Sequence, residues 1–237
     1  MQDYIKRAYA EELALLDKKI AHMGGLTEYN LGQAFDALVN RDPDLAHQVI
    51  NADADIDNLQ RDIEKQVIEM IAQRQPGVND LRTIMAVLKI ADGLERIGDL
   101  AKNIAKRVVA IVEQSYPRPL IVGMQNMLER ALSQLKDVLD AYGERNAELA
   151  LAVWRRDQSL DEAYNSVFRE LLTYMMEDPR NIGFCTHLLF GAKNLERIGD
   201  HTTNIAETVH YIVHGEEISD VRPKGDKTSI TLFDPDQ

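Results

Sequence analysis

The feature that most constrains the fold of this chain is an internal repeat. Leu94–Asp99 reads Leu-Glu-Arg-Ile-Gly-Asp, and the same six residues recur as Leu195–Asp200, 101 positions later (195 − 94). The agreement continues, because Asn-Ile-Ala stands at 103–105 and again at 204–206. A solenoid repeat has a period of only roughly 20–50 residues. The longer period indicates a duplicated, domain-sized unit that carries two copies of one site.

Composition and charge limit the function classes. The 237 residues, 45% of them hydrophobic, can bury one large core or two small ones, and the repeat favours two. The formal net charge of −12 disfavours binding to nucleic acid, whose phosphates require Lys and Arg side chains. With Cys185 as the single cysteine, no disulfide can form within the chain. The N-terminal residues lack the apolar core of a signal peptide, and no apolar run of roughly 18 residues could span a bilayer, so we expect a cytoplasmic protein.

Long amphipathic helices are the secondary structure that the sequence predicts. Apolar residues recur at intervals of three and four, for example from Ile56 to Met70, as is typical of one buried helix face. Helix-breaking residues separate these stretches at Asp42-Pro43, Pro76-Gly77, Pro117-Arg118-Pro119, Gly143 and Asp178-Pro179. The expected helices span residues 3–40, 43–74, 78–115, 119–142, 146–176 and 179–214.

These helices predict an all-α fold of two tandem antiparallel three-helix bundles related by internal duplication. The first bundle covers residues 1–116, the second covers 117–214, and residues 215–237 form an irregular acidic and polar tail.

Asp42 and Asp178 each precede a proline, so their carboxylates can cap the helix that follows. Gly24-Gly25 marks either a kink or an end in the first helix, and periodicity does not decide between them.

The repeated motif divides its helix into two faces, since successive residues are about 100° apart. Leu94 and Ile97 belong to the apolar seam, whereas Glu95, Asp99 and Asn103 fall roughly opposite it. The second copy places three equivalent side chains in the same way: Glu196, Asp200 and Asn204. We therefore expect the repeated acids to face outward, where core packing does not explain them.

Both copies of the motif weaken their own helix. Carboxylates four residues apart repel each other by a few tenths of a kcal/mol, and Gly98 and Gly199 each cost about 0.5–1 kcal/mol relative to alanine. Oxygen ligands at this spacing can share hard cations, and a glycine lets a neighbouring helix approach closely. The preceding helix of each half supplies a further acid pair: Asp53 with Asp57, and Asp157 with Asp161. Between antiparallel helices these acids would converge on one shallow patch, a candidate cation site.

Other interpretations of these residues remain open. An outward acid stripe is typical of a solvated helix face, and Arg96 and Arg197 could form surface ion pairs with Asp99 and Asp200. Glu207 and His210 match one half of a di-iron bundle site, but the first half carries Lys106 and Val109 instead, so a ferritin-like oxidase is the weaker alternative. A bare helical scaffold is another. The six histidines, Cys185 and Trp154 fit structural roles.

Several runs of residues make the chain recognisable. They are Met23-Gly24-Gly25, Asp42–Ile50, Arg74-Gln75-Pro76, Asp80-Leu81-Arg82, Met85, Leu94–Asp99, Asn194–His201 and Asn204–Glu207. With these runs the chain resembles, over nearly its whole length, the PhoU family of accessory regulators of bacterial phosphate uptake.

The resemblance implies a regulatory function without catalysis. It implies a cytoplasmic protein of two three-helix bundles that contacts the nucleotide-binding subunit of the phosphate ABC transporter and a phosphate-responsive sensor histidine kinase. It further implies negative regulation of the starvation response at high phosphate and a homo-oligomer, with a dimer as the first expectation. A chain of this charge would reach an anionic membrane only through other proteins.

The resemblance also implies metal sites, because some members carry multinuclear iron or zinc clusters on the repeated motifs. Transferred to this chain, the expected ligands are Glu95, Asp99, Glu196 and Asp200, with Asp53, Asp57, Asp157 and Asp161 as weaker candidates for iron, zinc or another divalent cation. Asp92 in the first copy is matched by Lys193 in the second (193 − 92 = 101), so we expect the second site to bind metal less tightly or differently.

Overall fold

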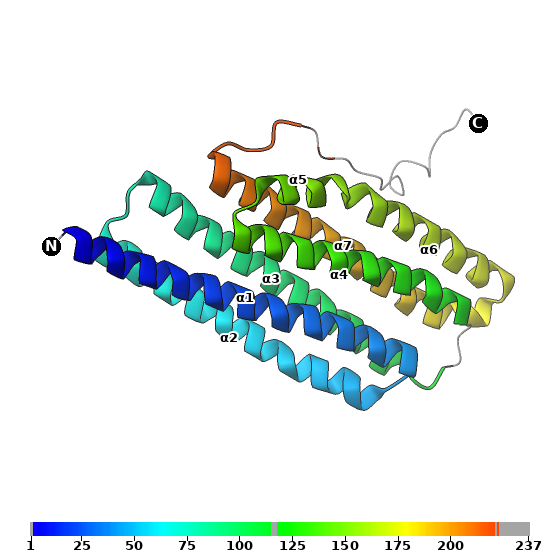
Figure 1. The fold of residues 1–237 in the computed structure, drawn as a ribbon. Helices are drawn as coiled ribbons and strands as arrows, with labels where there is room; N and C mark the ends of the chain where they lie inside the picture. Colours follow the sequence, from blue (N-terminus) through cyan, green and yellow to red (C-terminus); the bar gives the residue numbers. More distant parts are fainter. Residues whose placement is uncertain (1, 115–117, 221, 223–237) are drawn as a thin grey trace.

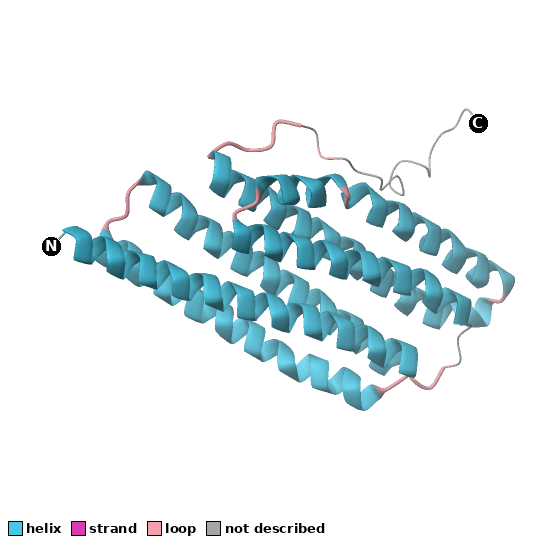
Figure 2. Ribbon diagram, in the orientation of Figure 1, coloured by secondary structure: helices cyan, strands magenta, loops and turns pink. Residues whose placement is uncertain are grey.

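The computed structural model describes residues 2–114, 118–220 and 222, and all secondary structure in these ranges is helical. The elements, in chain order, are α1 (Gln2–Asn40), α2 (Pro43–Arg74), α3 (Val78–Ile111), α4 (Arg118–Glu144), α5 (Ala147–Arg155), α6 (Asp157–Glu177), the short 3₁₀ helix η1 (Pro179–Asn181) and α7 (Ile182–His214). Figures 1 and 2 show the long helices lying side by side along one axis. The predicted all-α fold is confirmed.

Two bundles form, and they pack against each other. Helices α1, α2 and α3 contact one another, as do α4, α6 and α7, with α5 against α4 and α7. The halves meet chiefly where α3 lies along α7, and α1 also contacts α4. Consequently α3 has neighbours from α1, α2 and α7, and α7 has neighbours from α3, α4, α5 and α6. The two helices that carry the repeated motif therefore form the main contact between the halves and have neighbours on several sides.

Local sequence explains most of the helix boundaries. Asp42 caps α2, because its Oδ1 accepts a hydrogen bond of 2.9 Å from the backbone N–H of Leu45, and Pro43 follows it as predicted. Asn146 caps α5 in the same way. Asp178 also caps the segment after it, but that segment begins as the 3₁₀ helix η1 rather than as an α-helix. The residues that precede the first two caps, Arg41 and Arg145, both have a left-handed φ of 53°.

Several predicted boundaries are wrong. Helix α4 passes Gly143 and ends at Glu144, and α3 ends at Ile111 instead of reaching residue 115. The predicted first helix is correct, and Gly24-Gly25, left open by the sequence, is not an end of α1. The helix expected over 146–176 is broken at Arg156 into α5 and α6. At this break the carbonyl oxygen of Arg156 accepts hydrogen bonds from Gln134 Nε2 at 3.0 Å and from Ser159 Oγ at 2.8 Å. The same carbonyl also accepts a backbone bond of 3.1 Å from the N–H of Ser159, three residues on, so the two side chains add to a tightened turn at the break.

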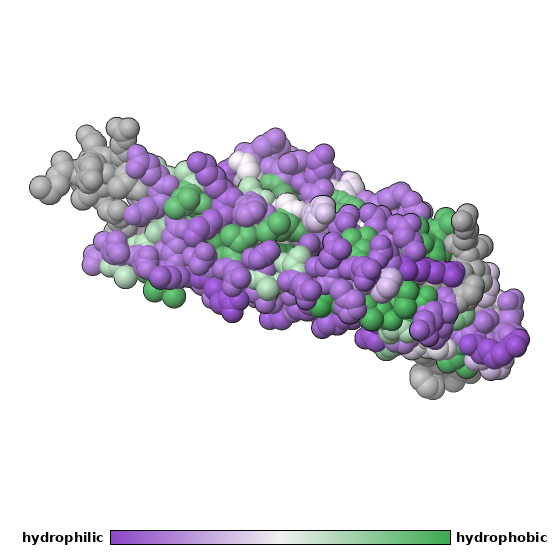
Figure 3. Space-filling model, turned by 90° about the horizontal axis from the view of Figure 1, so that it is seen from below, coloured by the Kyte–Doolittle hydropathy of each residue, from purple (hydrophilic) through white to green (hydrophobic). Residues whose placement is uncertain are grey.

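Buried apolar side chains form one core that runs through both halves. Leu94 and Ile97 of the first seam, like their counterparts Leu195 and Ile198, are fully buried. Cys185 and Trp154 also lie in this core, as predicted. The face shown in Figure 3 is mostly hydrophilic, with hydrophobic residues in separate patches. Among the described residues, no helix combines the length and the apolar character that crossing a membrane would require.

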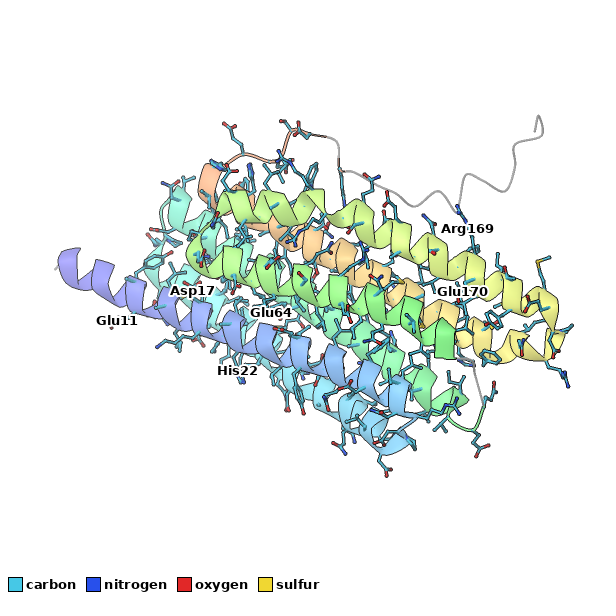
Figure 4. The ribbon with its side chains drawn as sticks, turned by 45° about the vertical axis from the view of Figure 1, so that its right-hand side comes forward. Glu11, Asp17, His22, Glu64, Arg169 and Glu170 are labelled. Atoms are coloured by element: carbon cyan, nitrogen blue, oxygen red, sulfur yellow. The ribbon has the colours of Figure 1, made fainter. Side chains whose placement is uncertain are left out.

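A polar cluster joins α1 to the end of α4. Asp17 of α1, labelled in Figure 4, accepts hydrogen bonds from the hydroxyl of Tyr142 at 2.5 Å and from Arg145 Nη2 at 3.0 Å. The guanidinium of Arg145 also lies 4.3 Å from the centre of the Tyr142 ring. This cluster joins α1 of the first repeat to the end of α4 in the second. Its bonds therefore supplement the larger contact between α3 and α7.

Candidate functional site

The repeated acids do not lie on a solvent face. Asp53 is 4% exposed, Asp157 is 2% exposed, and Asp161 and Glu196 are each 5% exposed. The expectation that the motif acids Glu95, Asp99, Glu196 and Asp200 all face outward is wrong for Glu196, which is buried, and Glu95 is partly buried. The physical reason is the enclosure of α3 and α7, since a helix with neighbours on several sides has little surface opposite its apolar seam.

The first acidic cluster lies between α2 and α3 and includes Asp53, Asp57, Glu95 and Asp99. Lys102, on the same helix as Asp99, donates a hydrogen bond of 2.5 Å to Asp99 Oδ1 and a second bond to Asp53 Oδ2. Burial raises the pKa of Asp53, and Lys102 opposes that rise. Burial also raises the pKa of Glu95, and the charge of Asp99 adds to the effect. Lys102 thus joins Asp53 of α2 to Asp99 of α3, and the charges of Asp57 and Asp99 act on Glu95 beside them.

The second acidic cluster lies between α6 and α7 and includes Asp157, Asp161, Glu196 and Asp200. Arg222, which follows α7 in the tail, donates from Nε to Asp157 Oδ2 at 2.8 Å and from Nη2 to Asp200 Oδ1 at 2.6 Å. Its Nη1 lies 3.4 Å from Asn204 Oδ1. The other oxygen of Asp157 accepts a bond of 3.1 Å from the hydroxyl of Thr203. Arg222 thus joins the two carboxylates across the helices.

The two clusters have the same carboxylates but different cations. Asp53 corresponds to Asp157 (157 − 53 = 104), as Asp99 corresponds to Asp200 (200 − 99 = 101). Lys102 corresponds to Thr203 (203 − 102 = 101), which carries no charge. In the second half Arg222 takes the place of that lysine.

The sequence analysis did not identify Lys102 and Arg222, the two cations that join carboxylates of neighbouring helices. The spacing of three residues between Asp99 and Lys102 was a usable signal, because such residues lie on one helix face. Arg222 had no local signal, since it lies outside the repeat. The anticipated surface pairs of Arg96 with Asp99 and of Arg197 with Asp200 are replaced by these contacts, and Arg96 instead lies 3.5 Å from Glu95.

Each cluster contains a glutamate oxygen that has no hydrogen-bond partner among the described residues. These atoms are Oε2 of Glu95 and Oε2 of Glu196, both buried. Burial raises the pKa of Glu196, the bond from Lys193 lowers it, and the charges of Asp200 and Asp161 raise it further. Lys193 Nζ donates a hydrogen bond of 2.9 Å to Glu196 Oε1. In the first half the residue that corresponds to Lys193 is Asp92. The substitution of Lys193 for Asp92 between the two copies therefore gives Glu196 an ion pair with a lysine that Glu95 does not have at the corresponding position.

The donor set suits a hard divalent cation, because it consists of carboxylate oxygens and includes two buried atoms that accept no hydrogen bond from the described residues, although Arg96 lies within ion-pair distance of the one on Glu95. Within the described residues, however, no three His, Cys, Asp or Glu side chains are arranged so that they could hold one metal ion. Lys102 and Arg222 instead supply the positive charge between the carboxylates. A metal ion at either cluster would thus require these side chains to move.

The motif glycines provide the close helix approach that was expected of them. A Cβ atom at position 199 would lie 2.5 Å from Cδ2 of Leu160 on α6, and one at position 98 would lie 3.0 Å from Cδ1 of Ile56 on α2. Real Cβ atoms essentially never show a contact of 2.5 Å, and a contact of 3.0 Å is tighter than nine in ten of theirs, so Leu160 or Ile56 would have to shift. The glycines therefore let α2 and α6 pack directly onto the motif helices.

The residues of the ferritin-like alternative make other contacts. Glu207 accepts a hydrogen bond of 3.0 Å from the indole N–H of Trp154. The ring of His210 lies 4.6 Å from that of His214, and its Nδ1 is 3.2 Å from the carbonyl oxygen of Glu216. His187 departs from the expectation of a satisfied histidine, because its buried Nδ1 has no partner among the described residues.

Known proteins share both the sequence and the fold. The PhoU domain family matches residues 20–108 and 124–209. A protein of Rhizobium meliloti named "Phosphate-specific transport system accessory protein PhoU homolog" is 52% identical over 226 residues, which are 95% of each chain. A protein of the same name from Caulobacter vibrioides is 48% identical over 97% of this chain and 100% of its own.

Two solved structures are also similar. The crystal structure of PhoU from Pseudomonas aeruginosa has a TM-score of 0.85 and 37% identity, and the match covers 88% of this chain and 100% of that one. The phosphate transport system regulatory protein PhoU from Streptococcus pneumoniae has a TM-score of 0.81 and 29% identity, with coverage of 90% and 100%.

Proposed function

The chain belongs to the PhoU family, and we propose that it is an accessory protein of a phosphate-specific transport system that restrains phosphate uptake and the starvation response at high phosphate. The observation that carries this proposal is the 52% identity, over 95% of both chains, to a protein named as an accessory protein of a phosphate-specific transport system. Both PhoU repeats are present within the similar region, so the likeness is not limited to one motif.

We further propose that the protein acts through protein contacts and has no catalytic activity of its own. The proposed partners are the nucleotide-binding subunit of the phosphate ABC transporter and a phosphate-responsive sensor histidine kinase, with the chain acting in the cytoplasm as a homodimer. The net charge of −12 supports docking on proteins rather than on lipid, because an anionic membrane surface repels such a chain.

Deletion of the gene and recovery of partners test the regulatory proposal. The deletion strain should express phosphate-starvation genes even in phosphate-rich medium and should take up phosphate without restraint, and the intact gene on a plasmid should restore repression. The tagged protein should recover the transporter subunit and the kinase from phosphate-replete cells. Normal repression in the deletion strain, together with no recovery of either partner, would refute the proposal and leave a scaffold or metal-storage role.

We also propose that the two acidic clusters bind divalent cations, with iron and zinc as the first candidates. The support is the carboxylate set shared by both halves and the buried Oε2 atom of Glu196, which accepts no hydrogen bond from the described residues. A bound cation would link α2 to α3 and α6 to α7 by neutralising carboxylates that now depend on Lys102 and Arg222.

Elemental analysis of the purified protein tests the cation proposal. The double variant D99N/D200N keeps the shape of both side chains and removes their charge, so its metal content should fall while its helix content stays the same. Asp55 is an exposed acid on α2 outside the clusters, and D55N is the matched control that should keep its metal. An unchanged metal content in D99N/D200N would rule out the assignment.

A further inference from the structure

We propose that a cavity between α3 and α7 receives an arginine side chain of a partner protein. The cavity has a volume of about 650 Å³, which is within the usual range of about 300–1,000 Å³ for ligand pockets. Its walls come from α3, from α7 and from Glu217 and Ile218, which follow α7. The inference rests on the protein contacts proposed above and names the chemistry of one of them.

The walls of the cavity carry more negative than positive charge. Among the described residues, three carboxylates line it, on Asp92, Glu207 and Glu217, and Lys89 supplies one ammonium. Glu207 accepts a hydrogen bond of 3.0 Å from the neutral indole of Trp154, which orients the carboxylate without neutralising it. The side chains of Asp92 and Glu217 form no ion pair within the described ranges. A cationic group therefore complements this cavity.

The two ends of the α3–α7 contact are related by the internal duplication. Arg107 of α3 lies beside Phe190 near the start of α7, with its guanidinium 4.8 Å from the centre of the ring. Gly93, earlier on α3, lies beside Ile205, later on α7. The two helices thus run antiparallel, as Figure 1 also shows. Because the helices are equivalent in the repeat, an approximate two-fold axis relates them, and each end of their contact has a counterpart at the other end.

The place that corresponds to the cavity holds an arginine of the chain itself. A shift of 101 residues relates Arg107 to Thr208 (208 − 107 = 101) and Lys89 to Phe190 (190 − 89 = 101). Thr208 and Lys89 both line the cavity. One end of the contact therefore has a guanidinium packed on an aromatic ring, where the other end has a threonine, a lysine and open space.

Charged residues at corresponding positions have opposite signs at the two ends. Lys106 corresponds to Glu207 (207 − 106 = 101), and Asp92 corresponds to Lys193 (193 − 92 = 101). The end that holds Arg107 therefore has lysines where the cavity has carboxylates, and no arginine lines the cavity among the described residues. An arginine from outside the chain would supply what this end lacks.

A guanidinium fits these walls better than an ammonium does. Tyr211 lines the cavity at the position where the first repeat has Ala110 (211 − 110 = 101), and the guanidinium of Arg82 already lies 5.4 Å from the centre of its ring. A planar guanidinium can stack on an aromatic ring and bond to carboxylates in a bidentate manner, whereas an ammonium is a compact, strongly hydrated point charge. The walls therefore favour arginine over lysine.

The exposure of the walls favours a side chain of a protein over a free small molecule. Lys89, Asp92, Asn204 and Glu217 are all exposed, so the cavity is open to solvent. A pocket that holds a free ligand usually buries about 70–90% of the surface of that ligand, which an open cavity does not do. A side chain on a folded partner is held in place by the rest of the interface, and arginine is one of the residues that dominate the binding energy of such interfaces.

Nuclear magnetic resonance on the full chain tests the chemistry, with Nα-acetyl-arginine amide as the probe for an arginine side chain. The probe should shift the backbone amide signals of Asn204 and Thr208 until they saturate, and Nα-acetyl-lysine amide should bind more weakly. D92N removes one of the charged partners and should weaken binding of the arginine probe about tenfold. D55N, which removes an exposed acid of α2 outside the cavity, is the matched control and should not change the affinity.

The variant T208R places an arginine of the chain itself at the position that corresponds to Arg107, so it should abolish binding of the probe. T173R adds the same charge at an exposed position of α6 and should bind the probe like the unmodified protein. Far-UV circular dichroism checks that both variants fold. In phosphate-replete cells, tagged T208R should lose the transporter subunit, the kinase or both, whereas tagged T173R should recover what the unmodified protein recovers.

The outcomes separate this inference from the proposed function. No saturable shift with the arginine probe, equal affinity for the lysine probe, or unchanged binding in T208R and D92N would overturn the inference. If T208R blocked the probe but recovered both partners, the cavity would take a small guanidinium compound, and docking of a partner there would be overturned. If the unmodified protein recovered neither partner, the contacts proposed above would fail, whereas recovery of both by every variant overturns only this inference.

Discussion

Replacing Gly199 with alanine should destabilise the protein, although alanine is the better helix former. The added Cβ would lie 2.5 Å from Cδ2 of Leu160, which is 1% exposed in the core and has little room to move. Overpacking of this kind costs typically about 1–3 kcal/mol, and the gain in helix propensity offsets at most about 1 kcal/mol. Because 2.5 Å is a severe overlap, we expect a net loss of about 1–2 kcal/mol.

The matched control is Gly25→Ala. Gly25 is also in mid-helix, but it is exposed and nothing lies within 4 Å of its added Cβ, so this variant should gain about 0.5–1 kcal/mol. Gly98→Ala should fall between the two, since its Cβ would lie 3.0 Å from the end of the Ile56 side chain.

Urea denaturation followed by far-UV circular dichroism measures all three glycine variants. In a thermal scan, a loss of about 1–2 kcal/mol corresponds to a decrease of roughly 2–8 °C in melting temperature for a chain of this size. If Gly199→Ala stabilised the protein as much as Gly25→Ala, the close approach of α6 to α7 would not constrain position 199 and the packing argument would be wrong.

Three further changes test the contacts described above. Burial raises the pKa of Glu196, so its protonation stabilises the fold below the ordinary pKa of 4.5, and that contribution is lost as pH rises through the higher folded-state pKa. The unfolding free energy, measured by denaturant titration, should therefore fall less from acidic to neutral pH in E196Q than in the unmodified protein. The same pH dependence in both proteins would contradict this. Y142F removes the hydroxyl bonded to Asp17 and should cost about 1 kcal/mol in the same assay, whereas no loss would show that this bond contributes nothing to stability. D42A removes the cap on the N–H of Leu45 and should also cost about 1 kcal/mol of unfolding free energy. An unchanged denaturation midpoint would show that water replaces the carboxylate.

The sequence by itself determined the class and the duplication of the fold. Helix periodicity and caps depend on residues that are near one another in the chain, so the cap at Asp42 and the all-α architecture could be predicted. The repeat identified which acids belong together, and the structure places Asp53 beside Asp99 and Asp157 beside Asp200. The role of these acids as metal ligands stays a prediction.

Only the tertiary structure decided which faces are buried and which cations accompany the acids. Amphipathic analysis assumes one buried face, and this assumption failed for Glu196 because α7 has neighbours on several sides. At the break at Arg156, one of the hydrogen bonds comes from Gln134 on another helix, which no local pattern indicates. Arg222 reaches the second cluster from beyond the repeat. In each case the deciding energy comes from contacts between residues distant in the chain, which local propensity does not contain.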